Sequence, residues 1–153
     1  MKYIKIILIT LLISGCASGP YSKKVSDNYA TLTTKTTCCF SDGLLHYSYV
    51  IYIDGVHTES LSGKFYLPPG KRQLGLAASL APGKKAYAVV NLDAQENYKY
   101  YLRVEEEEGT QIAKIYLDKE VVLSKAMEMY YGREYTAGEE TQKLLFEKIQ
   151  ESR

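Results

Sequence analysis

The feature that most constrains the fold is a series of short stretches with alternating or β-branched apolar residues, each followed by residues that favour turns. Glycine and proline mark most of these breaks, as at Asp54-Gly55, Pro68-Pro69-Gly70 and Ala81-Pro82-Gly83. Because the strands of small sandwiches recur at this spacing, the pattern predicts a mainly-β domain, a small antiparallel β-sandwich of about seven strands. The expected strands cover residues 29–34, 46–53, 64–67, 72–79, 84–92, 98–104 and 110–117.

Alternation within a strand predicts which side chains face the core, because neighbouring side chains point to opposite faces. In 72–79 and 98–104 every second residue is apolar, and Tyr101 falls on the outward side. In 46–53 the same count puts four apolar residues on one face and a mixed set on the other. The residues expected on the apolar faces are Leu74, Leu76 and Ala78, then Tyr98, Tyr100, Leu102 and Val104, then Tyr47, Tyr49, Ile51 and Ile53.

After Asp118 the apolar spacing changes to that of helices. A short helix is expected on the apolar residues Val121, Val122, Ala126, Met129 and Tyr130. A second is expected from near Thr136 to about Gln150, with Leu144, Leu145 and Ile149 on one face. The sequence therefore predicts a C-terminal α-helical extension over 119–153, whose apolar face either packs on the sandwich or contacts a partner.

The N-terminal residues determine where the chain is expected to reside. Lys2 and Lys5 precede an apolar stretch, 6–13, that is too short to cross a bilayer but suits the central region of an export signal. The stretch ends in Leu12-Ile13-Ser14-Gly15-Cys16, which resembles the lipobox of bacterial lipoproteins. The alternative is an ordinary secretory signal followed by an unrelated cysteine.

The lipobox resemblance implies that the chain is cleaved before Cys16, which is linked to diacylglycerol and acylated at its new amino terminus. It also implies a membrane anchor, and the absence of Asp at position 17 implies the outer membrane with the domain in the periplasm. The division that follows is a signal peptide over 1–15, a lipidated flexible tether over 16–28, a β-sandwich over 29–118 and a helical segment over 119–153.

Composition argues against one class of partner. The full chain has a net charge of +1, and loss of Lys2 and Lys5 brings the mature part to about −1. No basic face suggests nucleic acid, so none is expected as a partner. The chain contains 15 tyrosines. Their large rings and polar tips suit both half-buried strands and binding surfaces, and composition does not separate the two.

Export also affects the reading of the cysteines, because an exported chain meets oxidising conditions. With Cys16 assigned to lipid, Cys38 and Cys39 remain as an adjacent pair. Neighbours on a regular strand point to opposite faces, so a bond between them requires a distorted turn. We favour a vicinal disulfide over two free thiols or a bond to another chain. In each case the expected role is structural.

The middle of the chain has a family resemblance. The order Ile53-Asp54-Gly55, then Phe65 to Gly70 with Pro68-Pro69-Gly70, then Lys71 to Leu74, resembles the PEGA-like and DUF2846-like small β-domains of bacterial envelope proteins. That resemblance implies a transthyretin- or carboxypeptidase-regulatory-like sandwich over roughly 47–106. It implies no catalytic residues, because the shared motif is turn chemistry. The Cys38-Cys39 pair also faintly resembles the maltose-operon periplasmic protein family.

No catalytic, metal or cofactor site is expected. The chain has two histidines, His46 and His57, and neither has the spacing of a metal site or of a nucleophile–base motif. The acidic run 105–108 is interpreted as a solvated hairpin end, and the pairs Lys71-Arg72 and Lys84-Lys85 as surface charge.

We therefore expect a non-enzymatic binding or structural module of the cell envelope, attached to the membrane through Cys16 and contacting another envelope protein. The candidate partner surface comprises Tyr101, Leu144, Leu145 and Ile149. One alternative is a small envelope hydrolase or metal-binding protein that uses His46 or His57. Another is an inhibitor or immunity-type lipoprotein whose Pro68-Pro69-Gly70 loop projects toward a partner enzyme.

Overall fold

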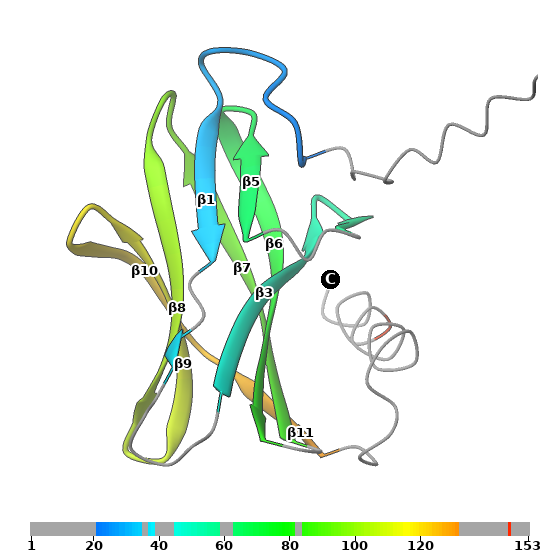
Figure 1. The fold of residues 1–153 in the computed structure, drawn as a ribbon, viewed down its shortest axis with the longest axis vertical. Helices are drawn as coiled ribbons and strands as arrows, with labels where there is room; N and C mark the ends of the chain where they lie inside the picture. Colours follow the sequence, from blue (N-terminus) through cyan, green and yellow to red (C-terminus); the bar gives the residue numbers. More distant parts are fainter. Residues whose placement is uncertain are drawn as a thin grey trace, which may run out of the picture.

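The computed structural model describes residues 21–34, 37–38, 45–58, 63–81, 84–131 and 147, and eleven strands lie in these ranges. They form two sheets (Figure 1). The first sheet, in spatial order, contains β10 (Glu120–Ala126), β9 (Thr110–Leu117), β8 (Lys99–Glu107), β1 (Ala30–Thr34) and β5 (Lys64–Leu67). The second contains β11 (Glu128–Tyr131), β7 (Lys84–Ala94), β6 (Gly70–Ala81), β3 (Leu45–Ile53) and β2 (Thr37–Cys38), with β4 (Val56–His57) paired to β3.

One hydrophobic core lies between the two sheets. As expected, alternate residues of β6 from Leu74 to Leu80 and of β8 from Tyr100 to Val104 are buried in this core, and removal of these side chains from water is the main stabilising contribution. The mainly-β, two-sheet prediction is thus confirmed. The largest fully buried side chains are Leu32, Phe65, Leu67, Leu102 and Ile115 from the first sheet and Ile53, Leu74 and Leu76 from the second.

The predicted tight turns form at residues that tolerate a left-handed backbone. Asp54 and Gly55 have φ values of 53° and 79° and join Ile53 directly to Val56. Glu108 and Gly109, with φ values of 50° and 78°, form the equivalent turn between β8 and β9. The acidic run therefore lies at a strand end and hairpin, as expected.

One pair of strands departs from the antiparallel expectation, because β1 pairs parallel to β8 and antiparallel to β5. The chain passes from β1 to β2 in the other sheet, so no hairpin links β1 to either neighbour. Its direction is therefore not determined by a tight turn, whereas the directions of β6 with β7 and of β8 with β9 are.

The predicted apolar face of β3 was wrong. The register shifts between Val50 and Tyr52, so Ile51 is an extra residue in the ladder. Val50 and Ile53 therefore both lie in the core between the sheets, whereas Tyr49 and Ile51 belong to a second cluster. A count with period two cannot detect a bulge, and it assigned Val50 to the wrong face.

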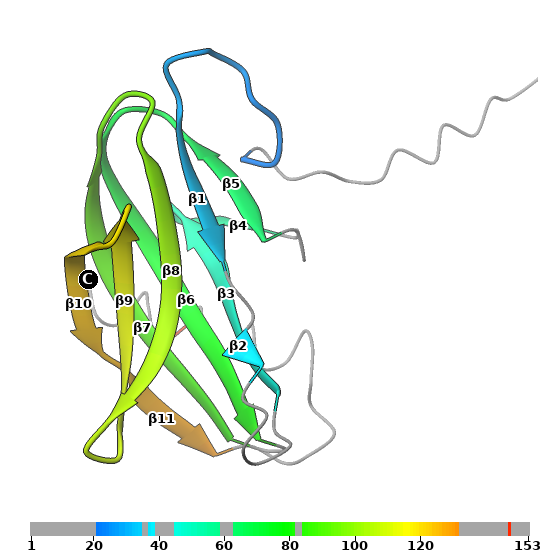
Figure 2. The same cartoon turned by 60° about the vertical axis from the view of Figure 1, so that its left-hand side comes forward.

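The short helix expected around Val121 to Tyr130 was also wrong, because β10 and β11 occupy this stretch. β10 pairs with β9 in the first sheet, and β11 pairs with β7 in the second (Figure 2). Met127 lies between them, is buried, and donates its backbone N–H to the carbonyl of Gln111 at 2.8 Å. The chain passes from the first sheet to the second at Met127, so the apolar residues of β10 and β11 do not all lie on one face. Their spacing along the sequence therefore resembles that of a helix.

The tether was expected to extend to residue 28, but Tyr21 and Asn28 are both held on the domain, and residues 23–27 between them are exposed. The carbonyl of Tyr21 accepts a hydrogen bond from Tyr66 N–H at 2.8 Å, and its ring packs against the core. The carbonyl of Asn28 accepts one from Asn97 N–H at 3.2 Å. Turn-forming composition suggested a flexible linker, but the Tyr21 ring gives this segment apolar surface to bury.

Several expectations fall outside the described residues. These concern residues 1–20 with Cys16, and the expected helix from 136 to 150 apart from Glu147, which is helical and exposed. Among the described residues no helix has the length and hydropathy that crossing a membrane requires.

Candidate functional site

The outer face of the first sheet carries tyrosines interleaved with basic side chains. Strand pairing places Tyr101 directly between Thr33 of β1 and Tyr116 of β9. Arg103 lies two residues along β8 on the same face, since Leu102 between them points into the core, as Tyr100 does. We call Tyr101, Arg103 and Tyr116, with the nearby Lys119, the tyrosine face. Sequence alternation correctly placed Tyr101 on it and Tyr100 in the core, but Tyr98 is 44% exposed rather than buried.

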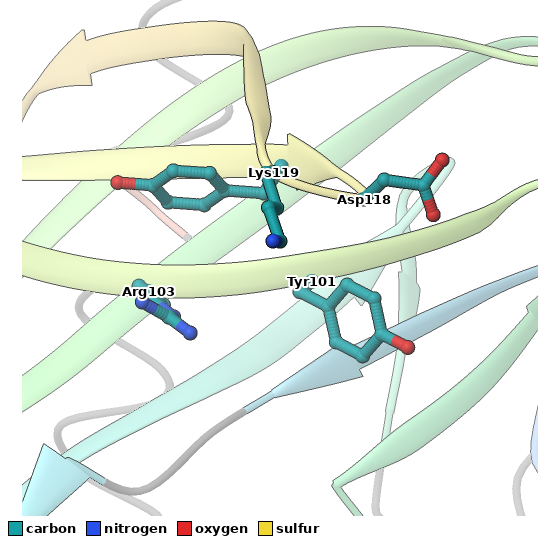
Figure 3. A pocket seen from close by; sticks show the side chains of 5 residues that line it. Tyr101, Arg103, Asp118 and Lys119 are labelled. Carbon is teal, nitrogen blue, oxygen red and sulfur yellow. The ribbon is translucent and has the colours of Figure 1, made fainter.

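A hollow of about 470 Å³ lies on the tyrosine face and is lined by Tyr101, Arg103, Tyr116, Asp118 and Lys119 (Figure 3). Two adjacent strands supply the first three residues, and the turn from β9 to β10 supplies the last two. Asp118 adopts a φ of 55°, which Asp tolerates better than most residues, and this turn sets the end of the hollow. The hollow thus combines two phenol rings with one guanidinium, one ammonium and one carboxylate.

Hydrogen bonds fix the ring of Tyr116. Its hydroxyl donates to the Glu105 carboxylate at 2.6 Å, and Lys114 forms ion pairs with Glu105 at 2.8 Å and with Glu107. The hydrogen bonds from Lys114 and Tyr116 lower the pKa of Glu105. The same carboxylate raises the pKa of Tyr116, because it accepts the hydrogen bond of the protonated hydroxyl. Glu105 is therefore a positioning residue within the acidic run, a role that composition alone did not reveal.

Arg103 and Lys119 supply positive charge to the hollow. The Arg103 guanidinium lies 5.3 Å from the ring centroid of Tyr116, a cation–π distance. Within the described part of the chain, neither Arg103 nor Lys119 forms an ion pair with a carboxylate. The contact with the Tyr116 ring does not use the N–H donors of Arg103 for a salt bridge, so these donors can bind an anion.

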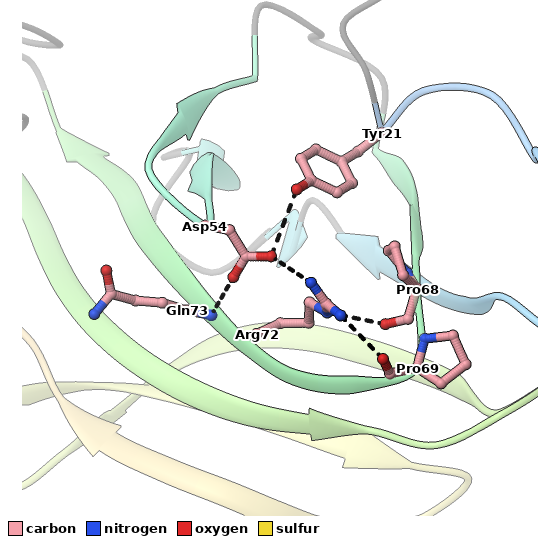
Figure 4. Close-up of polar contacts among 6 residues, drawn as sticks. All are labelled: Tyr21, Asp54, Pro68, Pro69, Arg72 and Gln73. Carbon is pink, nitrogen blue, oxygen red and sulfur yellow. Dashed lines mark hydrogen bonds and ion pairs between the residues drawn. The ribbon is translucent and has the colours of Figure 1, made fainter.

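A second polar cluster is centred on Arg72 at the end of the second sheet (Figure 4). Its guanidinium donates to the Asp54 carboxylate at 2.8 Å and to the carbonyls of Pro68 and Pro69, both at 3.0 Å. Asp54 also accepts the backbone N–H of Gln73 at 2.8 Å. The expectation that Arg72 is only surface charge was therefore wrong. It joins the Asp54-Gly55 turn to the proline turn.

Tyr21 completes this cluster, because its hydroxyl donates to Asp54 at 3.5 Å. Burial raises the pKa of Tyr21, and the neighbouring Asp54 carboxylate raises it further. Every group here has an internal partner, and proline carbonyls offer no reactive chemistry. We interpret the cluster as structural, since it holds residues 68–69 against their own domain rather than presenting them to a partner.

The histidines and cysteines do not form a site in the described ranges. The ring of His57 packs edge-on against Tyr52, with a centroid distance of 5.4 Å. His46 lies on β3, paired to Thr37 of β2, and Cys38 pairs with Leu45. No three His, Cys, Asp or Glu residues of the described part approach closely enough to hold a metal ion. The partner-surface residues Leu144, Leu145 and Ile149, and Cys16 and Cys39, lie outside the described residues.

The tyrosine face was only partly accessible to sequence reasoning. Alternation finds Tyr101 and Arg103 within one strand, but Tyr116 joins them only once the register of β8 with β9 is known. Comparison of the chain with protein-family models, curated proteins and solved structures finds no match. The interpretation of this face therefore depends on its geometry and chemistry.

Proposed function

We propose that this chain is a lipid-anchored envelope protein whose β-domain is a non-enzymatic binding module, and that the tyrosine face binds a glycan strand bearing carboxylates. The observation that carries the proposal is the hollow at Tyr101, Arg103 and Tyr116, which places flat rings beside cations that form no direct ion pair among the described residues.

The shape of the hollow favours an extended polymer. Sites for small molecules usually enclose most of the ligand surface, whereas this hollow lies on the outside of a sheet. Tyrosine rings can stack on the apolar face of sugar rings, and the Arg103 fork matches a carboxylate with two parallel hydrogen bonds. Lys119 adds a second cation, and Asp118 can accept from sugar hydroxyls.

The lipid anchor at Cys16 remains a proposal based on the lipobox and on export chemistry. If Cys16 is lipidated, five residue steps lead from the lipidated cysteine to Tyr21, which is held on the domain. A chain of that length spans at most about 18 Å, so the domain would lie close to the membrane surface. Ala17 after the cysteine supports the outer membrane, with the domain in the periplasm.

We also propose that the two sheets belong to the transthyretin-like type expected for PEGA-like and DUF2846-like domains. Support comes from the order of β3, the Asp54-Gly55 turn, β5, the Pro68-Pro69-Gly70 turn and β6. Two features of this chain are not part of the expected order of strands and turns. They are the parallel pairing of β1 with β8 and the continuation of the chain into β10 and β11.

The two alternatives gain less support. A hydrolase using His57 requires a carboxylate to orient the imidazole, but the contact that defines this ring is with Tyr52. An inhibitor using the proline turn requires a projecting loop, and Arg72 binds two carbonyls of that turn. The tyrosine face combines accessible rings and cations, so it is the better candidate.

Binding is tested with the purified full chain and a carboxylated glycan such as hyaluronate, with neutral dextran as the comparison. We expect saturable binding to hyaluronate that weakens with salt. Arg103→Ala should weaken it about tenfold, in line with the loss of a charge-assisted hydrogen bond. Lys24→Ala is the control, because Lys24 lies on the N-terminal segment and pairs with Asp27. Equal binding of dextran, or an unchanged Arg103→Ala affinity, would contradict the proposal.

The anchor is tested separately by fatty-acid labelling in bacteria that express the full chain. We expect label on the wild-type chain and none on Cys16→Ala. A labelled Cys16→Ala variant would refute the anchor while leaving the glycan proposal intact. Crosslinking in cells, with Cys16→Ala as control, then tests whether another envelope protein is a reproducible neighbour.

A further inference from the structure

The outer face of the second sheet carries apolar side chains that are buried. Tyr49, Ala77 and Tyr87 lie directly opposite one another across β3, β6 and β7. Ala77 and Tyr87 are 0% and 7% exposed, and Ile51 on the same face is 2% exposed. Ile51, Ala77 and Tyr87, together with Tyr52, form a cluster separate from the core between the sheets, and the half-buried Tyr49 and Val89 pack against it. We call this cluster the outer apolar face.

The burial of the outer apolar face is not due to packing in the core between the sheets. The neighbours Val50, Leu76 and Ala88 point toward the first sheet and belong to the core. The outer apolar face therefore points away from the first sheet, where water would be expected. In the described ranges, one contact lies at the margin of this face, where the Tyr87 hydroxyl donates to the Glu128 carboxylate of β11 at 2.6 Å. No described strand crosses the face itself, so the rest of the cover comes from residues outside those ranges.

The face is apolar over only half its length. Toward the other end of β6 and β7, the outward pairs are Gln73 with Asn91 and Lys71 with Asp93, and Asn91, Lys71 and Asp93 are exposed. Burial raises the pKa of Tyr49 and lowers that of Lys85, which lies beside the apolar half. The covering element therefore excludes water from one half of this face and leaves the other half exposed to solvent. Such an element is smaller than a third sheet that covers the whole face.

The chain itself supplies an element of this size and position. β11 ends at Tyr131, opposite Lys84, at the edge of the same sheet. The segment that follows contains the expected amphipathic helix from near Thr136 to about Gln150, and such a helix is about 22 Å long. Four strands spaced about 4.8 Å apart span about 14 Å, so this helix is long enough to cross the face.

We infer that residues 136–150 pack as a helix on the outer apolar face, with Leu144, Leu145 and Ile149 against Tyr49, Ile51 and Tyr87. Glu147, which is helical and exposed, lies on the polar side that this packing requires. The inference does not depend on the glycan proposal. It makes the C-terminal segment a third layer of the domain, so Leu144, Leu145 and Ile149 are removed from the partner surface.

The test measures the accessibility of tyrosine side chains in the full chain by hydroxyl-radical footprinting and mass spectrometry. In the wild type, Tyr49 and Tyr87 should be protected. In Leu145→Asp their labelling should rise by about tenfold, because loss of the docked layer opens the site locally. Gln150→Asp adds the same charge on the opposite side of the expected helix and should leave both tyrosines protected. Tyr100, in the inter-sheet core, must stay protected in every variant.

A cysteine pair gives a second measurement that does not depend on destabilisation. Val89→Cys with Leu145→Cys should form an intramolecular disulfide on oxidation, identified by peptide mapping, whereas Val89→Cys with Gln150→Cys should not. The inference is overturned if Tyr49 and Tyr87 remain protected in Leu145→Asp, or if the first pair fails to crosslink. It is also overturned if their protection in the wild type disappears on dilution, since the cover is then a second copy.

Discussion

Arg72 is expected to contribute more to stability than a surface charge, because three groups depend on its guanidinium. Two donors bind the carbonyls of Pro68 and Pro69 at 3.0 Å, and a third binds Asp54 at 2.8 Å. Hydrogen bonds to charged groups contribute about 1.5–3 kcal/mol when buried. Arg72 and Asp54 side chains are 24% and 29% exposed, so we discount each bond to about 1 kcal/mol for screening. Arg72→Ala should therefore lower the free energy of unfolding by about 3 kcal/mol.

Two further variants separate the ion pair from the bonds to the turn. Arg72→Lys keeps the charge beside Asp54 but lacks a fork for both carbonyls, so it should lose about 2 kcal/mol. Asp54→Asn removes the ion pair and should lose about 1 kcal/mol. Asp54→Asn and Arg72→Ala both remove the bond between these two side chains. The double variant should therefore lose about 1 kcal/mol less than the sum of the two single losses.

The assay is equilibrium unfolding in urea at neutral pH, with the m-value checked for constancy. Lys24→Ala provides the control, because its ion pair with Asp27 is exposed and its loss should be unmeasurable. The reasoning is refuted if Arg72→Lys costs nothing, since the carbonyl contacts would then contribute nothing. It is also refuted if Arg72→Ala costs no more than Arg72→Lys, since the interaction with Asp54 would then contribute nothing. A strictly additive double variant would refute the coupling of Arg72 to Asp54.

Three other predictions concern single positions. Gly109→Ala should cost about 1–2 kcal/mol, because φ is +78° and no atom lies within 4 Å of the added methyl group, so the cost is conformational; a neutral result in urea would contradict the turn. Met127→Ala should cost about 2–4 kcal/mol in the same assay, since it empties the site where the strand changes sheets; a cost below about 1 kcal/mol would place Met127 outside the core. The pKa of Glu105 is lowered on folding, so its stabilisation is complete above its unfolded value near 4.5 and is lost as the pH falls through the folded value. Glu105→Gln should therefore lose less stability than wild type between neutral pH and pH 3, and an unchanged acid profile would argue against the Lys114 and Tyr116 contacts.

The strands were predictable where side chains alternate without interruption. β6 and β8 are examples, because Leu74 and Leu76, like Tyr100 and Leu102, keep one face throughout. The prediction failed where a backbone irregularity changes the face. The bulge at Ile51 inverts the end of β3, and the change of sheets at Met127 breaks the period of the last strands. The residues around the bulge and around the change of sheets have no composition from which either feature could be predicted.

The candidate site was less predictable than the fold, because it depends on pairing between strands. Tyr101 could be placed on an outer face from its own strand, but its neighbour Tyr116 comes from the register of β8 with β9. Arg72 appeared to be ordinary surface charge because its partners, Asp54 and two carbonyls, are brought to it by two turns. Long-range pairing therefore decides which polar residues are structural and which remain available to a ligand.

The proposed anchor and the tyrosine face together limit where a ligand can lie. The carbonyl of Tyr21 is bound by Tyr66 of β5, and β5 is separated from β8 only by β1. Two strand spacings amount to about 10 Å, and the linker from Cys16 to Tyr21 spans at most about 18 Å. If Cys16 carries lipid, Tyr101 therefore lies within about 30 Å of the membrane surface. With that anchor, a glycan bound at this face would run close to the membrane surface.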